Sequence, residues 1–429
     1  MTVMGRDTIF AVSSGAPPAG IAIIRISGPA AGTILAAVAG VLPAPRLATL
    51  RRLRDRDGAL IDQALILWFP GPATVSGEDL AELHLHGGRA VVARMLAVLS
   101  EIPMARAAEA GEFTRRAFLN GRIDLLEAEA LGDLLSAETE YQRRAALAMA
   151  DGTLGRIIDP CRQTALRLAA LVEASLDFGD EDDVAAARVD IAAEARTLAR
   201  TITDTLAAPS VERLRDGIVV VLAGPPNAGK SSLLNALVQR DAAIVSPLPG
   251  TTRDVVDVPV TIAGVPFLFS DTAGLRESEE LVERIGIDRA RDRIARTDLL
   301  LWLGDEPPPS HPNTAWLFPR RDIRLHEAIP NDRMAISTVT GEGMDALGHW
   351  LRARATLLLP QPDGVALSRR QRQELALAAA AADDAASITD LVLQAEALRR
   401  LCAAFDRLTG KAGFEDVLDV IFGQFCLGK

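Results

Sequence analysis

The alternation of apolar and polar positions divides the chain into segments of different kinds. Between residues 8 and 120, short apolar or alternating runs are separated by Gly and Pro, as in TIFAVSS, GIAIIRISG, ALILWF and AELHLHGG. This pattern is typical of strands joined by turns. Residues 123–207 instead repeat apolar positions at helical spacing, and so does the chain from residue 367 onward. Residues 217–358 alternate short apolar strands with helices, which is typical of a parallel α/β domain.

The two helical segments flank the α/β segment, which indicates one helical domain interrupted by an insertion. Such an insertion needs chain ends that lie close together, as those of α/β domains often do. We therefore expect an N-terminal α+β domain over residues 1–121 and a helical domain in two parts, 122–213 and 359–429. The inserted domain is expected over residues 214–358.

Composition narrows the class of protein. Aromatic residues make up only 4% of the chain against 49% hydrophobic residues, which favours helices over a β-sandwich. The net charge of −11 argues against a general polyanion binder, so a nucleic-acid contact would be local or shared with a partner. Three scattered cysteines argue against a disulfide framework. With neither a signal-peptide pattern nor a membrane-length apolar run in the sequence, we expect a cytoplasmic protein with no membrane contact.

The strongest motif is a phosphate-binding loop, GPPNAGKSS, between an apolar strand and a helix. Its glycines allow backbone N–H groups to surround phosphate oxygens, and the helix N-terminus favours negative charge. Lys230 is expected to contact the β and γ phosphates, and the Ser231 hydroxyl to bind Mg²⁺. The loop residues expected to bind GTP are Asn227, Ala228, Gly229, Lys230, Ser231 and Ser232.

Two later segments indicate a Ras-like GTPase domain with switch segments that respond to the γ-phosphate. GTTRD (250–254) can offer a Thr hydroxyl to Mg²⁺, and FLFSDTAGL (267–275) is an apolar strand that ends in an aspartate. Asp271 is suited to hold Mg²⁺ through water, and the Gly274 N–H to sense the γ-phosphate. The expected GTP contacts in these segments are Gly250, Thr251, Thr252, Asp271, Thr272, Ala273 and Gly274.

Base recognition departs from the usual pattern. The position of the guanine-reading Asn-Lys-x-Asp motif is occupied by residues 319–322, which read PRRD. Asp322 can still accept hydrogen bonds from guanine, and Arg320 can stack along the base. Ser337 and Thr338 occupy the place of the second base-binding loop. Phosphate binding is therefore predicted to be intact, while base selection is predicted to be weakened.

Catalytic groups are less evident. Leu275 stands where many GTPases have a water-orienting Gln, so another group must position the nucleophile and another cation must replace an arginine finger. Asn227 could help to bind a monovalent cation. Glu283 is a carboxylate on the switch side, although its pattern alone favours a solvated helix residue.

The N-terminal domain carries a charge inside an apolar strand. Arg25 in IAIIRISG shares a strand face with Ile21 and Ile23, and a buried charge needs a partner. Glu82 is one candidate, and a structural ion pair would explain the two residues. His84 and His86 lie nearby, but a third metal ligand is not apparent.

The tail FGQFCLGK leaves two interpretations open. Cys426 follows Phe422 by four positions and could end an apolar helical stripe as a small hydrophobic residue. Alternatively it could be a functional thiol, with a pKa that Lys429 could lower.

The chain resembles the tRNA uridine-modification GTPase family MnmE (TrmE). The similarity runs from residue 7 to residue 429 and rests on GIAIIRISGP, FPGPATVSGEDLAELHLHGG, GEFTRRAFLNGRIDLLEAEAL, GPPNAGKSSLLNAL, GTTRD, DTAGLRESEELVERIGI and FCLGK. The resemblance implies a folate-binding N-terminal domain, a helical domain and an inserted G domain. It also implies a homodimer that works with an FAD-dependent MnmG-type partner as a heterotetramer. With a methylene-tetrahydrofolate carbon, that complex adds an aminomethyl or carboxymethylaminomethyl group at C5 of the tRNA wobble uridine.

The resemblance also implies roles for individual residues. Glu283 would orient the attacking water, with Lys230 on the phosphates, and Cys426 would be needed for modification. Mg²⁺ would be held by Ser231 and Thr252, and K⁺ by Asn227, Ser246, Leu248 and Thr251. The loop residues Ser246, Pro247, Leu248 and Pro249 would also contact GTP. A 5-formyl- or 5,10-methylene-tetrahydrofolate would be bound by Arg25, Glu82, Arg122 and Lys429.

Two other functions stay open at this point. One is a regulatory GTPase switch, for example in ribosome assembly, that uses the same G domain without carbon chemistry. The other is a degenerate family member with relaxed nucleotide specificity, for which Pro319 is the main argument. Folate binding by the N-terminal domain would distinguish the first from a modification GTPase.

Overall fold

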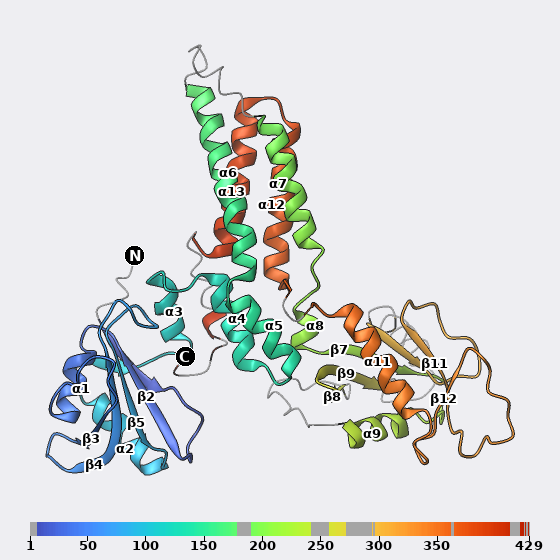
Figure 1. The fold of residues 1–429 in the computed structure, drawn as a ribbon, viewed down its shortest axis with the longest axis horizontal. Helices are drawn as coiled ribbons and strands as arrows, with labels where there is room; N and C mark the ends of the chain where they lie inside the picture. Colours follow the sequence, from blue (N-terminus) through green and yellow to red (C-terminus); the bar gives the residue numbers. More distant parts are fainter. Residues whose placement is uncertain are drawn as a thin grey trace, which may run out of the picture. The chain divides into compact units, whose positions relative to one another are not determined.

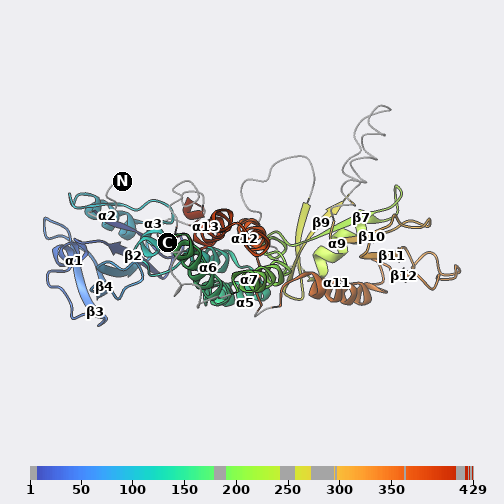
Figure 2. The same cartoon turned by 90° about the horizontal axis from the view of Figure 1, so that it is seen from above.

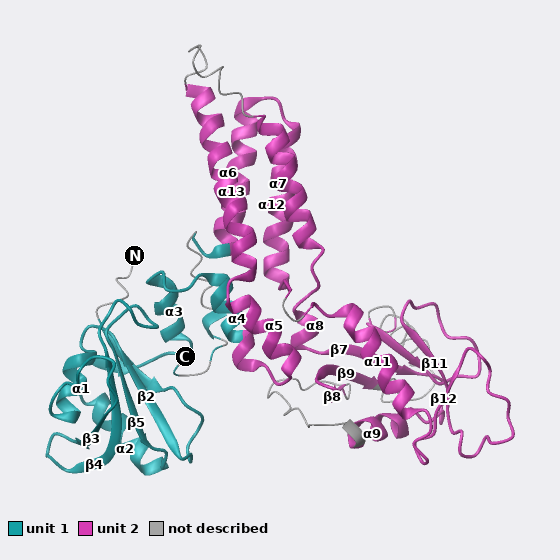
Figure 3. Cartoon of the chain, viewed as in Figure 1, with its two compact units in different colours: residues 1–132, 409–429 teal, residues 133–408 magenta. Residues whose placement is uncertain are grey.

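The computed structural model describes residues 7–177, 190–241, 257–271, 294, 297–361, 364–411, 421–423, 425 and 428. The chain forms two compact units, unit 1 with residues 1–132 and 409–429 and unit 2 with residues 133–408 (Figure 3). Within the described residues, the helices are either too short or too polar to span a bilayer.

Unit 1 is built on a six-stranded sheet in the order β3-β4-β5-β2-β1-β6 (Figure 1). Neighbouring strands are antiparallel except β1 and β6, which are parallel. Helices α1 and α2 cover one face of the sheet. The elements are β1 (Thr8–Val12), β2 (Ile21–Ser27), α1 (Ala31–Ala39), β3 (Thr49–Arg54), β4 (Leu60–Phe69), β5 (Leu80–His86), α2 (Arg89–Ser100), β6 (Ala105–Ala107) and α3 (Glu112–Leu119).

The two faces of this sheet differ in their surroundings. Ile24 and Ile26 alternate toward the helices and are fully buried, together with Leu83 of β5. On the opposite face Ile21 is 61% exposed and Leu65 is 45% exposed. Only one face of β2 therefore packs against α1 and α2.

The C-terminal segment of the chain packs in unit 1. Phe422 and Phe425 are buried beside Leu125 and Ala128 of α4 (Leu125–Ser136). The rings of Phe422 and Phe425 lie 6.1 Å apart, and the ring of Phe118 lies 6.1 Å from that of Phe422. An aromatic cluster thus anchors this segment.

The long helices α6, α7, α12 and α13 run side by side in unit 2, and Figure 2 shows them from above. Arg162 of α6 pairs with Asp406 of α13 at 2.8 Å, and Arg407 of α13 pairs with Glu374 of α12 at 2.8 Å. The Ser368 hydroxyl caps α12. The helices of unit 2 outside its sheet region are α5 (Glu140–Ala150), α6 (Thr153–Asp177), α7 (Ile191–Leu206), α8 (Glu212–Arg215), α12 (Arg369–Ser387) and α13 (Leu391–Thr409).

A second six-stranded sheet, in the order β12-β11-β10-β7-β9-β8, forms the inserted domain. All pairs are parallel except β8 with β9. A two-residue turn at Ala263 and Gly264 joins these strands, and so short a connection requires antiparallel pairing. The elements are β7 (Ile218–Ala223), α9 (Lys230–Asp241), β8 (Asp257–Ile262), β9 (Val265–Asp271), β10 (Leu299–Trp302), β11 (Thr314–Phe318), β12 (Met334–Ala335) and α11 (Met344–Leu358).

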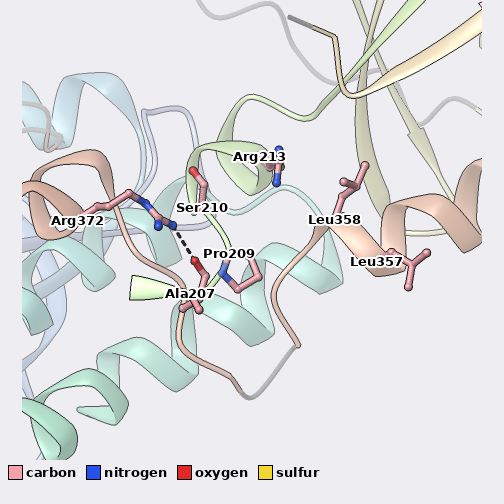
Figure 4. Close-up of a pocket in the computed structure, with 8 residues that line it drawn as sticks. Ala207, Pro209, Ser210, Arg213, Leu357, Leu358 and Arg372 are labelled. Carbon is pink, nitrogen blue, oxygen red and sulfur yellow. Dashed lines mark hydrogen bonds between the residues drawn. The ribbon is translucent and has the colours of Figure 1, made fainter. Parts of the chain in front are cut away.

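The entry and exit segments of the insertion lie side by side. The Val211 N–H donates to the Leu367 carbonyl at 3.1 Å, and the Leu367 N–H donates to the Pro209 carbonyl at 3.1 Å. A cavity of about 540 Å³ lies at this junction (Figure 4). The two arginines that line the cavity have partners within the chain. Arg372 donates hydrogen bonds to the Leu206 and Ala208 carbonyls, and Arg213 donates to the Asp298 carboxylate. The cavity therefore belongs to the domain junction rather than to a candidate site.

Candidate functional site

The phosphate loop joins the end of β7 to the start of α9 at the carboxyl edge of the sheet. Gly224 has a φ of 145°, and a Cβ there would lie 3.0 Å from the Leu303 carbonyl carbon. Gly229 has a φ of 101°, and Asn227 adopts a left-handed φ of 58°. These backbone conformations curl the loop around the helix N-terminus, where backbone N–H groups and the helix dipole favour an anion.

Lys230 turns back over this loop. Its Nζ donates to the Gly224 and Pro225 carbonyls, at 2.9 Å each, and the side chain is buried. The ammonium group is therefore held beside the loop that would surround the phosphates of a nucleotide. Ser231 follows in the first turn of α9, where a hydroxyl can reach a metal ion at the same edge.

The loop that the sequence predicts to read the base follows β11 and is called the base-reading loop below. Asp322 accepts a hydrogen bond from the Ser337 hydroxyl at 2.7 Å, and Ser337 is fully buried. The Ser337 oxygen also accepts from the N–H groups of Val339 and Thr340, at 3.2 Å each. This hydrogen bond connects the loop after β11 to the loop after β12, and it fixes the orientation of the Asp322 carboxylate. Thr338 lies in the same loop and is half-buried.

Arg320 connects the base-reading loop to the phosphate loop. Its guanidinium donates to the backbone carbonyl of Asn227. Arg320 has a left-handed φ of 59°, which turns the chain directly after Pro319. The side chain predicted to stack along the base is therefore also a bridge between the two loops.

Several predicted residues lie outside the described part of the chain. These are Ser246, Pro247, Leu248, Pro249, Gly250, Thr251, Thr252, Thr272, Ala273, Gly274, Glu283, Cys426 and Lys429. Asp271 ends β9, as the sequence predicts, and its side chain also lies outside the description.

A second group of predicted residues comes together in unit 1. Arg25 of β2 lies opposite Glu82 of β5, and their side chains form an ion pair at 2.9 Å. The side chains are 22% and 17% exposed, so the pair is reachable from the face of the sheet opposite α1 and α2. His84 lies 3.3 Å from the other Glu82 oxygen, and the Arg25 guanidinium lies 5.8 Å from the ring centre of Phe113. His86 instead pairs with Asp62, and the described residues contain no cluster suited to a metal ion.

Two family models together match nearly the whole chain. The model "GTP-binding protein TrmE N-terminus" matches residues 8–122, and the model "MnmE helical domain" matches residues 125–426. The tRNA modification GTPase MnmE of Erythrobacter litoralis is 53% identical, covering 99% of this chain and 100% of its own. The same enzyme of Novosphingobium aromaticivorans is 53% identical with the same coverage, and that of Zymomonas mobilis is 50% identical over 98% and 100%.

The chain belongs to the tRNA modification GTPase MnmE family. Among solved structures, the G domain of the T. maritima FeoB iron transporter matches at 26% identity over 32% of this chain and 98% of that chain. The TM-score of that match is 0.23, which is too low to support an argument about fold or function.

One charged cluster of this MnmE-family chain is absent from the sequence prediction. Arg116 of α3 is buried and contacts Asp7 at 2.9 Å, Glu78 at 3.2 Å and Glu112 at 2.9 Å. Burial would raise the pKa of Glu112, but hydrogen bonds from Arg106 and Arg116 outweigh it, so the pKa lies below its usual value. The cluster fastens α3 to the sheet next to the candidate folate site. A charged residue every third or fourth position of a short helix is an ordinary surface pattern, so the sequence carries no signal for it.

The loop before β5 brings the third predicted folate residue near the sheet. A Cβ on Gly77 would lie 3.2 Å from the Cγ atom of Arg122, so the two segments are in contact. The Asn120 amide donates to the Ser76 carbonyl at 2.7 Å, which holds the end of α3 to the same loop. Arg122 itself is exposed.

The described end of the MnmE-family tail lies beside β1. The Ser13 hydroxyl donates to the Gly428 carbonyl at 2.7 Å, and the Ser13 N–H donates to the Ile23 carbonyl at 2.7 Å. Gly428 therefore lies next to the strand pair that carries Arg25.

Proposed function

We propose that this protein hydrolyses GTP and that hydrolysis serves the modification of tRNA. The relatives that match over their full length are named tRNA modification GTPases. The observation that carries the proposal is the meeting of the phosphate loop, Asp322 and Ser337 at one edge of the second sheet. Open α/β sheets bind nucleotides at this edge, outside the carboxyl ends of their strands.

The described side chains suit this reaction. Lys230 holds a positive charge at the loop, and the N-terminus of α9 adds backbone donors for the phosphates. Ser231 and Thr252 would hold Mg²⁺, which supplies positive charge to the phosphate oxygens. Asn227, Ser246, Leu248 and Thr251 would hold K⁺, which supplies the charge that an arginine finger supplies in other GTPases. Glu283 would orient the attacking water.

We further propose that unit 1 binds a tetrahydrofolate derivative. Glu82 can accept from paired N–H groups of a pterin, and the Arg25 guanidinium, 2.9 Å away, orients that carboxylate. Arg122 and Lys429 would contact the same ligand, and Cys426 would act in the modification step. The carbon would reach C5 of the wobble uridine in a complex with an FAD-dependent MnmG-type partner. This process would take place in the cytoplasm.

Homodimerisation through unit 1 is part of the same proposal. The face of the sheet opposite α1 and α2 exposes Ile21, Leu50 and Leu65, which are 61%, 54% and 45% accessible. Exposed apolar side chains on one face of a sheet are suited to pair with a second copy.

The first experiment compares turnover of GTP, ATP and XTP by the purified protein in KCl and in NaCl, with Mg²⁺ present. We expect fast turnover of GTP in KCl alone, and Lys230→Ala as the control should lose it. Equal turnover of all three nucleotides would favour a family member with relaxed base selection, as Pro319 suggests. Absence of turnover in both salts would contradict the proposed GTPase.

The second experiment reconstitutes the protein with its FAD-dependent partner, tRNA and methylene-tetrahydrofolate. We expect a modified wobble uridine, detected by mass spectrometry of the digested tRNA. GTP turnover without folate binding or uridine modification would instead favour a regulatory GTPase switch.

A further inference from the structure

One part of unit 1 carries arginines without neighbouring acidic residues in the sequence. Residues 8–54 contain none of the 57 Asp and Glu residues of this acidic chain, although they contain five arginines. Three of these lie in β3, which is the outermost strand of its sheet (Figure 1). A fourth arginine follows in the turn after β3. We call this group the arginine edge, and it consists of Arg51, Arg52, Arg54 and Arg56.

The contacts of the arginine edge do not cancel its positive charge. Three of its guanidinium groups donate to backbone carbonyl oxygens, Arg51 to Leu50 at 3.2 Å, Arg54 to Gly58 at 2.6 Å and Arg56 to Glu101 at 2.9 Å. Arg52 stands opposite Gln63 of β4, which is uncharged. Because a carbonyl oxygen accepts a hydrogen bond without carrying a net charge, the edge stays positively charged.

The carboxylates nearest in the sequence are mostly paired with other cations. Asp55 pairs with Arg94 of α2 at 2.7 Å, and its side chain is only 8% exposed. Asp62 pairs with His86 at 2.8 Å, and its side chain is 9% exposed. Of these three nearby carboxylates, Asp57 alone is exposed. One exposed carboxylate against four arginines leaves the edge with a net positive charge.

The strand presents two of these charges in a row. Arg52 and Arg54 are both exposed, and Leu53 between them is fully buried in the helix-covered core. Side chains two positions apart on a strand leave the same face, roughly 6.5 Å from each other. The buried leucine fixes which face that is, because a shift by one residue would expose it and bury the arginines. The two guanidinium groups are therefore held on one side of the sheet.

The arginine edge lacks the side chains that stack on bases. Residues 46–67 contain no Phe, Trp or Tyr. Proteins that bind single-stranded nucleic acid commonly stack its bases on aromatic rings, so that mode of binding does not fit this edge. Guanidinium groups instead match the geometry of phosphate oxygens and donate to them in pairs. The edge is therefore suited to a phosphate backbone, which provides affinity and orientation without reading the sequence.

We propose that the arginine edge of unit 1 binds the phosphate backbone of the tRNA. The inference rests on the proposed function, which makes tRNA the substrate, and it names the surface that holds this substrate. A chain with a net charge of −11 can bind a polyanion only where the local charge is positive, and the edge provides such a place. The four arginines act in binding and lie outside the group of residues proposed to take part in the chemistry.

Direct binding tests the surface without any turnover. The probe is a fluorescently labelled, unmodified tRNA, titrated with the purified protein between about 50 and 200 mM KCl. Arg52→Gln/Arg54→Gln should lower the affinity at least roughly tenfold at the lowest salt concentration. The slope of log affinity against log salt should become shallower by roughly 1.5, because two phosphate contacts no longer release counterions. A tRNA that is not a substrate should lose affinity by the same factor, because phosphate contacts do not read sequence.

Two double variants are the controls. Arg52→Lys/Arg54→Lys keeps both charges and should keep the salt dependence of the wild type. Arg196→Gln/Arg200→Gln removes the same number of charges from exposed positions of α7 in unit 2, and it should bind tRNA as the wild type does. GTP turnover and the melting temperature should be unchanged in all variants.

The reconstituted modification reaction tests the same surface during turnover. Arg52→Gln/Arg54→Gln should raise the KM for tRNA at least roughly tenfold with kcat unchanged. A contact far from the reacting atoms holds the substrate and the transition state equally, so its loss affects KM alone. A lower kcat with unchanged KM would contradict a binding role.

The other results of the binding experiment also decide the matter. Unchanged tRNA affinity in Arg52→Gln/Arg54→Gln would overturn the proposal and leave the arginines the role of protecting an edge strand from pairing. Weaker binding of the FAD-dependent partner with unchanged tRNA affinity would assign the edge to an acidic protein surface instead. A changed oligomeric state in light scattering would assign it to contact between copies of this chain. An equal loss of affinity in the α7 control would reduce the effect to overall charge.

Failure of the surface and failure of the proposed function give different results. A wild type that does not bind tRNA at the lowest salt concentration would overturn the surface. A wild type that binds tRNA through the arginine edge but modifies none, with its partner and folate present, would refute the proposed function and leave the surface supported.

Discussion

Ser337→Ala tests whether the carboxylate of Asp322 reads the base. The substitution removes the hydroxyl that donates to Asp322 at 2.7 Å, and it leaves the N–H groups of Val339 and Thr340 without their acceptor. A hydrogen bond to a charged group contributes roughly 1.5–3 kcal/mol. If GTP binding needs the carboxylate in this orientation, affinity should fall roughly 10- to 150-fold. Alanine fits the fully buried site, so the fold should persist.

The assay is the dissociation constant of a fluorescent GDP analogue, with the melting temperature as a check of folding. Ser100→Ala is the control, because that hydroxyl only donates to the Leu96 carbonyl at 2.8 Å on an exposed helix end. Asp322→Asn extends the test, since an amide donor matches the 2-oxo group of xanthine instead of the 2-amino group of guanine. The Asp322→Asn variant should therefore bind XTP in preference to GTP. GDP affinity within twofold of the wild type in Ser337→Ala would refute the assigned role of this hydrogen bond.

Three further predictions concern unit 1. Glu82→Gln should weaken 5-formyl-tetrahydrofolate binding at least roughly tenfold in calorimetry while GTP affinity stays unchanged, because the carboxylate paired with Arg25 is lost; unchanged folate affinity would count against the site. Phe422→Ala should lower the free energy of unfolding by about 3–5 kcal/mol, whereas Leu393→Ala, at a side chain 58% exposed, should change it little. Glu112 has a lowered pKa, so its contribution to stability is complete above its ordinary value of 4.5 and is lost as the pH falls further. Glu112→Gln should therefore show a shallower loss of stability in acid than the wild type, and equal acid slopes would contradict the assignment.

Local sequence was sufficient to predict that a strand, a glycine-rich loop and a helix follow one another at residues 218–241. Gly224, Gly229 and Lys230 lie within a few positions of one another, between a run that favours a strand and a run that favours a helix. The backbone conformations of the loop follow from its glycines, so long-range contacts are not needed to specify it. The same holds for β9, which ends at Asp271 as its apolar run predicts.

Pairs between distant segments were harder to predict. Arg25 needed a partner, and Glu82 was one candidate, but only the β2–β5 register shows that the two stand opposite each other. A shift of that register by one residue would move Glu82 to the helix-covered face. The exposure of Ile21 was also decided by tertiary structure, because α1 and α2 cover a single face of the sheet.

The sequence by itself therefore determined the glycine-rich loop between β7 and α9, the succession of strand-rich and helical segments, and the presence of a strand charge in need of a partner. Tertiary structure alone decided that Asp322 is held by Ser337, that Arg116 gathers three carboxylates, and that Ser13 meets Gly428. The physical reason is separation along the chain. Local conformational preferences act between near neighbours, whereas these contacts join segments whose meeting depends on the register and packing of the whole unit.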